Sequence, residues 1–281
     1  MPVMRWLAPT TESENVEGEM EFKSLRIDHD NGLARLVFTQ SERGNPIDGD
    51  FCREFCDAAI MLSETPGVRA VLMTAEGKAF SYGGDVKSFV DQLDQLPSRI
   101  KRWTTDLHSG IARIQRMDAP VVAAVHGICA GGMAAMVAGA DIVVAEPATR
   151  FVAAYAGIGY SNDAGASIML ARRLGLARAR RFLLLNETLD AETALAAGLA
   201  DEVVPAEDLR TRAEAIARRL SEGPTRAFGE MRRLLLSVAD QPLETQLELE
   251  AQALARIAGS ADAREGLIAF AEKRKPVFKG A

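Results

Sequence analysis

The sequence predicts an α/β fold in which parallel strands alternate with helices, followed by a helical C-terminal region. Two apolar runs of strand length, residues 68–74 and 121–125, are each followed by a glycine-rich turn and a helical pattern. Strands that alternate with helices pair in parallel through right-handed crossovers. From residue 206 onward the pattern is almost wholly helical, with Gly-Pro and Gln-Pro breaks between the helical periods.

Three further segments complete the predicted order of elements. Residues 1–20 are polar and acidic without a sustained period, and we interpret them as a flexible N-terminal tail. Residues 25–38 hold two short alternating runs on either side of Asn31-Gly32, a pair that predicts a tight hairpin of two antiparallel strands. A helical pattern covers residues 50–64, and residues 142–145 form another buried strand.

The composition narrows the class of protein. The chain has 281 residues, of which 48% are hydrophobic, and a formal net charge of -6. An acidic balance argues against a dedicated nucleic-acid binder, because neutralising phosphates requires an excess of Lys and Arg. No apolar run approaches the roughly 18 residues of a membrane span, and Cys52, Cys56 and Cys129 lack metal-ligand spacing. We expect a cytoplasmic protein with no metal and no membrane partner.

Two glycine pairs follow the buried strands and are the first candidates for a functional site. Gly83-Gly84 lies in the run 80–87, and Gly131-Gly132 lies in the run 126–133. Glycine lets the backbone approach a ligand closely, and the free N–H groups at a helix start suit a developing negative oxygen. Either pair alone is more typical of an ordinary strand-to-helix turn, but the two together with their flanking sequences are far more specific.

These flanking sequences resemble the crotonase superfamily, also called the enoyl-CoA hydratase/isomerase family. The segments that carry the resemblance are Asn45, the run 80–87, residues 119–127 (APVVAAVHG), Gly131-Gly132, residues 140–145 (ADIVVA), residues 194–204 and residues 270–278. The resemblance implies a ββα superhelix of stacked sheets and helices over residues 21–205, which carries coenzyme A and the active site. It also implies that residues 206–281 form a helical trimerisation region, giving a homotrimer or a hexamer made of two trimers.

The resemblance further implies an acyl-CoA thioester substrate, with no cofactor other than the coenzyme A of the substrate itself. It assigns the oxyanion hole to the backbone N–H groups of Gly84 and Gly132, where two donors stabilise an enolate-like intermediate. The residues that it assigns to coenzyme A are Arg43, Tyr82, Asp85, Lys87, Lys273 and Phe278, the last two from the same chain or from a neighbouring subunit.

Two positions decide against ordinary hydratase chemistry. Hydratases of this family add water with two glutamates, and the matching positions here are Ala135 and Tyr155. Neither side chain supplies a carboxylate. We expect both residues, together with Leu107, to line the substrate pocket instead.

A different pair of residues is a candidate for the chemistry. Residues 151–175 are similar to the 4-chlorobenzoyl-CoA dehalogenase branch, and the match reaches back without a gap to His108. In that branch the aspartate matching Asp163 attacks the aromatic ring and displaces halide, and the histidine matching His108 activates water to hydrolyse the aryl ester. A carboxylate is a competent nucleophile and a neutral imidazole a competent base. Alone, His108 would be interpreted as a surface residue and Asp163 as a helix N-cap.

The substrate and the reaction stay open at this point. The halobenzoyl enzymes wall their ring with aromatic side chains, whereas this chain has Gly84, Leu107 and Tyr155 in that region, so we expect a weaker grip on a flat aryl group. A bulkier, aliphatic or more polar acyl group is an equal alternative. Asp163 also matches an acid of the dienoyl-CoA isomerases, which leaves proton transfer open. Decarboxylation stays open as well, because it needs the oxyanion hole and little else. An enoyl-CoA hydratase or isomerase with atypical acids and a non-catalytic acyl-CoA-binding relative are the remaining alternatives.

Overall fold

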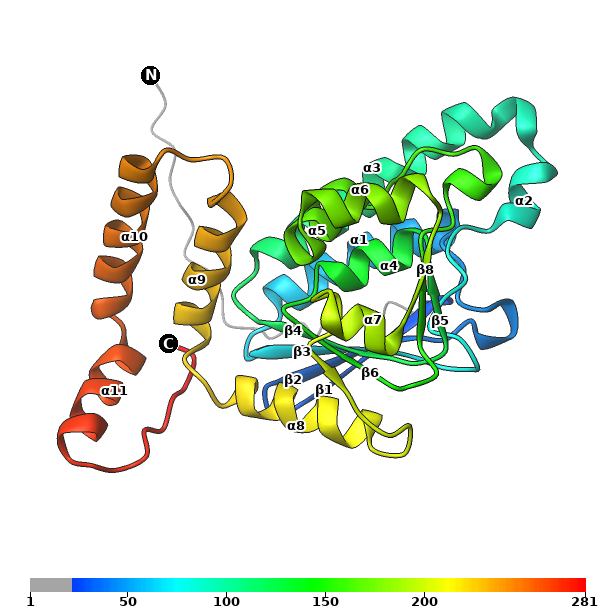
Figure 1. Cartoon of the computed structure of the whole chain (residues 1–281). Coiled ribbons are helices and arrows are strands. Elements are labelled where there is room, and N and C mark those ends of the chain that lie inside the picture. Colours follow the sequence, from blue (N-terminus) through cyan, green and yellow to red (C-terminus); the bar gives the residue numbers. More distant parts are fainter. Residues whose placement is uncertain (1–21) are drawn as a thin grey trace, which may run out of the picture.

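The computed structural model describes residues 22–281, so the predicted tail of residues 1–20 lies outside the described residues. Its main sheet has six strands in the order β1-β2-β3-β4-β6-β9 (Figure 1). These strands are β1 (Leu25–Asp30), β2 (Leu33–Phe38), β3 (Ala70–Ala75), β4 (Val121–Val125), β6 (Ile142–Ala145) and β9 (Glu202–Val203). Within this sheet only β1 and β2 pair antiparallel, and each following pair of neighbouring strands is parallel. The predicted parallel α/β core is confirmed.

The predicted hairpin between β1 and β2 is present, with its turn at Asn31 and Gly32. Both residues have a positive φ, 47° for Asn31 and 83° for Gly32. Two-residue hairpin turns whose twist matches the strands require this conformation at both central positions, and asparagine and glycine adopt it at the least steric cost. The local sequence therefore fixes where the chain reverses.

Helices cover both faces of the main sheet (Figure 1). Side chains alternate along β4, so that Val121, Ala123 and Val125 join one hydrophobic cluster while Val122 and Ala124 join the other. The first face packs against α1 (Gly49–Glu64), α3 (Leu96–Arg116) and α4 (Gly132–Ala138). The second face packs against α8 (Leu209–Ser221). The core thus continues into α8, the first helix of the region that was predicted to serve oligomerisation.

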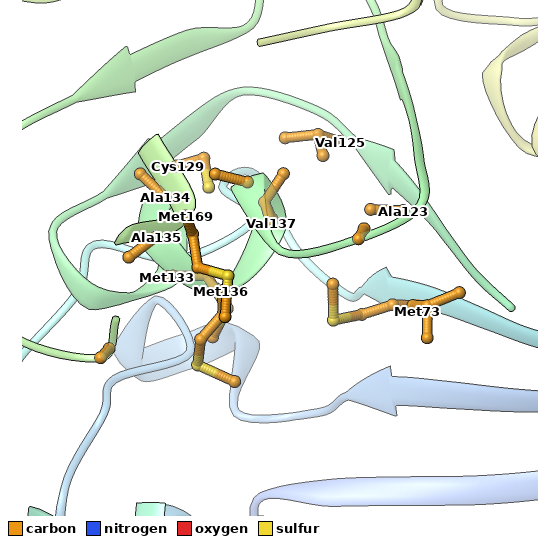
Figure 2. Packing of buried hydrophobic residues seen from close by; sticks show 14 of the residues in the cluster. Met73, Ala123, Val125, Cys129, Met133, Ala134, Ala135, Met136, Val137 and Met169 are labelled. Carbon is orange, nitrogen blue, oxygen red and sulfur yellow. The ribbon is translucent and has the colours of Figure 1, made fainter. Parts of the chain in front are cut away.

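Helix α4 is held entirely inside the protein, since all of its residues are buried. Figure 2 shows Met133 and Met136 of α4 beside Met169 of α5 (Ala166–Leu174). Methionine side chains are flexible and fill irregular gaps between packed elements. This packing fixes the first turn of α4, which begins at Gly132 of the second glycine pair.

A second, smaller sheet includes the strand that leads directly into the second glycine pair. It consists of β5 (Ile128–Ala130), β7 (Arg150–Val152) and β8 (Thr188–Asp190), with β5 parallel to β7 and β7 antiparallel to β8. The sequence patterns did not predict β5, which stands between β4 and α4. The remaining core helices are α2 (Val86–Val90), α6 (Leu176–Leu184) and α7 (Ala191–Ala196), with 3-10 turns η1 (Ser41–Arg43), η2 (Leu93–Gln95) and η3 (Ala156–Ile158).

The C-terminal helices α9 (Thr225–Ser237), α10 (Leu243–Ala258) and α11 (Ala261–Ala271) extend away from the sheet (Figure 1). Arg232 on α9 joins them to the core. Its buried guanidinium donates to the carbonyl oxygens of Ile114 (2.9 Å), Ala119 (3.1 Å) and Met117, and it pairs with the carboxylate of Asp141 (3.0 Å). None of the helices among residues 22–281 has the length and apolar character that crossing a membrane requires.

Replacing Arg232 with methionine should lower the free energy of unfolding by about 3 kcal/mol, because three carbonyl groups and Asp141 would lose their buried donor. Urea unfolding followed by circular dichroism measures this loss. The control is Arg256→Met, which removes a pair with Glu230 from an arginine side chain that is 56% exposed; it should cost less than about 1 kcal/mol. Equal losses in the two variants would show that Arg232 does not anchor α9.

Candidate active site

The two glycine turns lie side by side because a short backbone bridge joins them. Ser81 pairs with Cys129 of β5 in parallel register, with the Ser81 amide donating to Ile128 (3.0 Å) and the Ala130 amide donating to Ser81 (3.0 Å). At Gly83, where φ is 85°, a Cβ atom would lie 2.9 Å from the carbonyl oxygen of Ala130. Glycine is therefore required at this position for the turns to approach so closely.

The amides of Gly84 and Gly132 donate to no acceptor within the described part of the chain. Several neighbouring amides are engaged: the Ile47 amide donates to the carbonyl oxygen of Gly83 (2.8 Å), the Asp85 amide to that of Ile47 (3.3 Å), and the Gly131 amide to that of Val152 (2.9 Å). Backbone N–H groups in folded proteins rarely remain unpaired unless water or a ligand accepts from them. Both glycines line one cavity of about 460 Å³.

His108 and Asp163 lie in the same cavity and contact each other. His108 projects from α3, Asp163 lies in the loop before α5, and their Nε2 and Oδ1 atoms are 2.6 Å apart. The Asp163 side chain does not cap α5, whose N-cap is Gly165 without a side-chain bond. The helix-capping interpretation of Asp163 is therefore excluded, and the joint spacing of the two residues does bring them together.

Tyr155 lies in the cavity wall and supports the loop that carries Asp163. Its hydroxyl donates to the backbone oxygen of Asp163 (3.1 Å). Burial raises the pKa of the Tyr155 phenol above its usual range, so this group remains a neutral donor. The predicted lining residues Tyr155 and Leu107 both line the cavity.

The expectation of a pocket with little aromatic bulk is wrong. Phe89 of α2, Trp103 of α3 and Tyr160 line the cavity. The Phe89 ring stacks with Trp103 at a centroid distance of 5.9 Å and with Tyr160 at 6.3 Å. Sequence reasoning missed this aromatic wall because its rings come from three separate segments that form no local motif. Such a wall suits a flat, apolar group.

The predicted coenzyme A residues divide into two groups. Tyr82 lines the cavity and is 55% exposed. Arg43 and Asp85 form an ion pair (2.6 Å) next to Gly84, and Arg43 also pairs with Asp48 (2.9 Å). Lys87 is exposed on the short helix α2.

Lys273 and Phe278 form the second group and do not reach the cavity of their own chain. The carbonyl oxygen of Phe278 accepts from Arg69 (3.1 Å), which directly precedes β3, whereas the first glycine turn follows the other end of β3. Figure 1 shows the C-terminus and α11 on the opposite side of the molecule from α2. Neither Lys273 nor Phe278 therefore lines the cavity that holds Gly84 and Gly132.

Ala135 and Cys52 do not lie as the sequence analysis expected. Ala135 was predicted to line the pocket, but it is fully buried in the core on α4 and does not line the cavity (Figure 2).

Cys52 lines the cavity although no role was predicted for it. Burial, with a contribution from nearby carboxylates, raises the pKa of its thiol to about 12, so the thiol is not a nucleophile at neutral pH. Within residues 22–281 no group of His, Cys, Asp and Glu side chains could hold a metal ion.

Comparisons with known proteins agree with this geometry. The family Enoyl-CoA hydratase/isomerase matches residues 28–281. The chain is 33% identical over 266 residues to the 1,2-epoxyphenylacetyl-CoA isomerase of Escherichia coli, covering 93% of this chain and 99% of the relative. It is 29% identical over 250 residues to 4-chlorobenzoyl coenzyme A dehalogenase-1 of an Arthrobacter species, covering 89% and 91%.

A solved enoyl-CoA hydratase from Mycobacterium smegmatis has a TM-score of 0.85 to this structure at 27% identity, covering 91% of this chain and 99% of that chain. The sequence match extends over most of the chain, and the solved structure shares its arrangement of sheets and helices. The resemblance drawn from the glycine turns and their flanking sequences is confirmed. The chain belongs to the enoyl-CoA hydratase/isomerase family, the crotonase superfamily of acyl-CoA enzymes.

Proposed function

We propose that this protein catalyses substitution and hydrolysis on an aryl-CoA thioester whose ring bears a leaving group. The amides of Gly84 and Gly132 bind the thioester oxygen, Asp163 attacks the ring, and His108 activates water. The observation that carries the proposal is the contact of 2.6 Å between His108 and Asp163 inside the cavity that also holds the two unpaired amides.

The first step uses the electron demand of the polarised carbonyl group. An Asp163 oxygen forms a bond to the ring carbon that carries the leaving group, and the displaced electron pair moves through the ring to the thioester oxygen. Two N–H donors stabilise the negative charge that develops there. The electron pair then returns from the thioester oxygen to the ring, and the bond to the leaving group breaks. The leaving group departs as an anion. The product of this step is an aryl ester of Asp163.

The second step regenerates the enzyme. His108 takes a proton from water, and the resulting hydroxide adds to the ester carbonyl of Asp163. The bond between that carbonyl carbon and the aryl oxygen breaks, which releases a hydroxyaryl-CoA and the Asp163 carboxylate. The proton held by His108 then leaves to solvent. Overall, water is consumed, and the leaving anion and one proton are released.

Two features of the site support this reaction over the alternatives. The reaction requires a nucleophile and a separate base, and Asp163 and His108 supply both. The cavity volume of about 460 Å³ lies in the range of small-molecule sites, and Phe89, Trp103 and Tyr160 provide surfaces on which a flat ring packs. The proposal needs no cofactor other than the coenzyme A of the substrate.

A second candidate is isomerisation, in which Asp163 alone moves a proton along an unsaturated acyl chain. The E. coli relative, an isomerase by name, is more similar to this chain than the dehalogenase is. Labelling separates the two reactions. A single turnover of 4-chlorobenzoyl-CoA in 18O-labelled water should place the label in Asp163 and not in the first product. Isomerisation of an enoyl-CoA in deuterated water would introduce deuterium without any exchange of oxygen.

We also propose that the protein is a homotrimer or a hexamer. The C-terminal helices expose large apolar side chains that a neighbouring subunit would cover: Leu235, Leu254, Leu267 and Phe270 are each at least 67% exposed. In such an assembly Lys273 and Phe278 would contact the coenzyme A bound by a neighbour.

The Asp163→Asn variant should lose turnover by about 10²- to 10⁴-fold, because an amide is neither a nucleophile nor a base. His108→Gln should still form the aryl ester and accumulate it, which intact-protein mass spectrometry detects. The reactions are tested with 4-chlorobenzoyl-, enoyl-, dienoyl- and malonyl-CoA. Unchanged turnover in both variants would exclude the pair as the catalytic groups. Binding without turnover of any thioester by the unmodified protein would instead support a non-catalytic relative.

The Gly132→Pro variant should lower kcat by about 10²- to 10³-fold, because proline has no N–H group to donate to the thioester oxygen. Position 132 is the first residue of α4, where a helix tolerates proline. The matched control is Gly132→Ala, which adds a Cβ atom with the same close contact to Ile47 but keeps the N–H group. The comparison of these two variants separates the replacement of the N–H hydrogen by a ring carbon from the effect of the added Cβ atom. Similar kcat values in both would contradict an oxyanion role for Gly132.

The Trp103→Leu variant should weaken binding of benzoyl-CoA relative to hexanoyl-CoA by about fivefold, as expected when one aromatic contact of about 1 kcal/mol is lost. Isothermal titration with both thioesters measures the ratio. Val90→Leu, an exposed change on α2 that does not line the cavity, should leave it unchanged. A constant ratio in Trp103→Leu would mean that the aromatic wall does not select an aryl group.

A further inference from the structure

The cavity that holds Gly84, Gly132 and the aromatic wall is called the acyl cavity below. A second cavity lies on the other side of the catalytic pair. It has a volume of about 540 Å³, and we call it the rear cavity. Among residues 22–281, His108, Asn162 and Asp163 are the three that line both cavities. The pair and Asn162 therefore form a partition between two spaces.

The two spaces differ in chemical character. Aromatic and aliphatic side chains dominate the acyl cavity, whereas the lining of the rear cavity is mixed. The polar side chains of Gln115, Arg116, Ser167, Arg172 and Asp240 line it together with apolar ones, Ile111, Ile168, Met169 and Leu236. The side chains of His108 and Asp163 are 51% and 40% exposed although they contact each other. Water thus has access to the partition.

The hydrolysis step needs water at a specific place. The ester carbonyl of Asp163 and the His108 ring must both reach one water molecule while the aryl group still occupies the acyl cavity. That group would pack against the wall formed by Phe89, Trp103 and Tyr160 and exclude water from that side. The rear cavity contacts the same two catalytic residues, and neither Phe89, Trp103 nor Tyr160 lines it.

We propose that the rear cavity is the solvent entrance of the His108–Asp163 pair, separate from the acyl cavity, and that it supplies the water that His108 activates. The role of this water in hydrolysis rests on the proposed function. The existence of the entrance does not rest on it, because the rear cavity is present whatever reaction the protein catalyses. Water and the aryl substrate then approach Asp163 from opposite sides.

Ala112 allows the entrance to be blocked. It follows His108 by one helical turn on α3, is exposed, and lines the rear cavity but not the acyl cavity. A phenylalanine there would occupy the rear cavity beside His108. Arg113, the next residue, is also exposed and lines neither cavity. Arg113→Phe is therefore a control of equal bulk on the same helix.

With 4-chlorobenzoyl-CoA, Ala112→Phe should form the Asp163 ester at a rate within twofold of the unmodified protein, while hydrolysis of the ester slows at least tenfold. Rapid-quench mass spectrometry measures both steps. Arg113→Phe should change neither rate. Hydrolysis at an unchanged rate in Ala112→Phe would overturn the proposal that the water comes from the rear cavity, and equal slowing of both steps would show that the acyl cavity was damaged instead.

A second measurement tests the entrance without any turnover. Diethyl pyrocarbonate modifies accessible histidines, and peptide mass spectrometry separates His108 from His29, an exposed reference. With the acyl cavity filled by benzoyl-CoA or hexanoyl-CoA, whichever binds by titration calorimetry, His108 should still react within about threefold of its rate in the free protein. Ala112→Phe should then slow this reaction at least tenfold.

The two measurements fail in different ways. Full protection of His108 by the bound thioester alone would overturn the separate entrance, whatever the chemistry. A different outcome separates the two claims. If His108 still reacts with the thioester bound and Ala112→Phe blocks that reaction, the entrance is established. If Asp163 then takes up no oxygen from water, the hydrolytic function is overturned.

Discussion

The arrangement of the site depends on the parallel bridge between Ser81 and Cys129. This bridge joins two turns that are far apart in the sequence, and within the described residues the amides of Gly84 and Gly132 have no internal acceptor. A donor fixed by the fold need not reorganise when charge develops on a substrate oxygen. The buried helix α4 and the small sheet hold the bridge in place, so the packing of the core is also what aims the two donors.

Much of the fold followed from local patterns in the sequence. The hairpin at Asn31-Gly32, the strands over 121–125 and 142–145, and the C-terminal helices lie where turn chemistry and periodicity predicted them. Strand β5 was missed because three residues are too few to show a period. The sequence left open whether α8 packs on the core, because an amphipathic stripe does not reveal whether it packs on its own sheet or on another chain.

The site was predictable where residues lie inside a matched segment and was less so elsewhere. His108 and Asp163 are 55 residues apart in the sequence and meet as expected. The aromatic wall of Phe89, Trp103 and Tyr160 was not foreseen, since its members meet only after α2, α3 and the loop before α5 have packed together. Ala135 was misplaced because a position in a motif does not show which way a small side chain on a short helix points.

The bond from the Tyr155 hydroxyl to the Asp163 backbone bears on how this chain can change in evolution. An acid at position 155, as in the hydratases, would remove the support of the loop that presents Asp163. A second acid at position 135 would need a charge in a fully buried place on α4. Neither change is useful alone, and each harms what is already present. Water addition across a double bond by two carboxylates is therefore out of reach of any single substitution in this site.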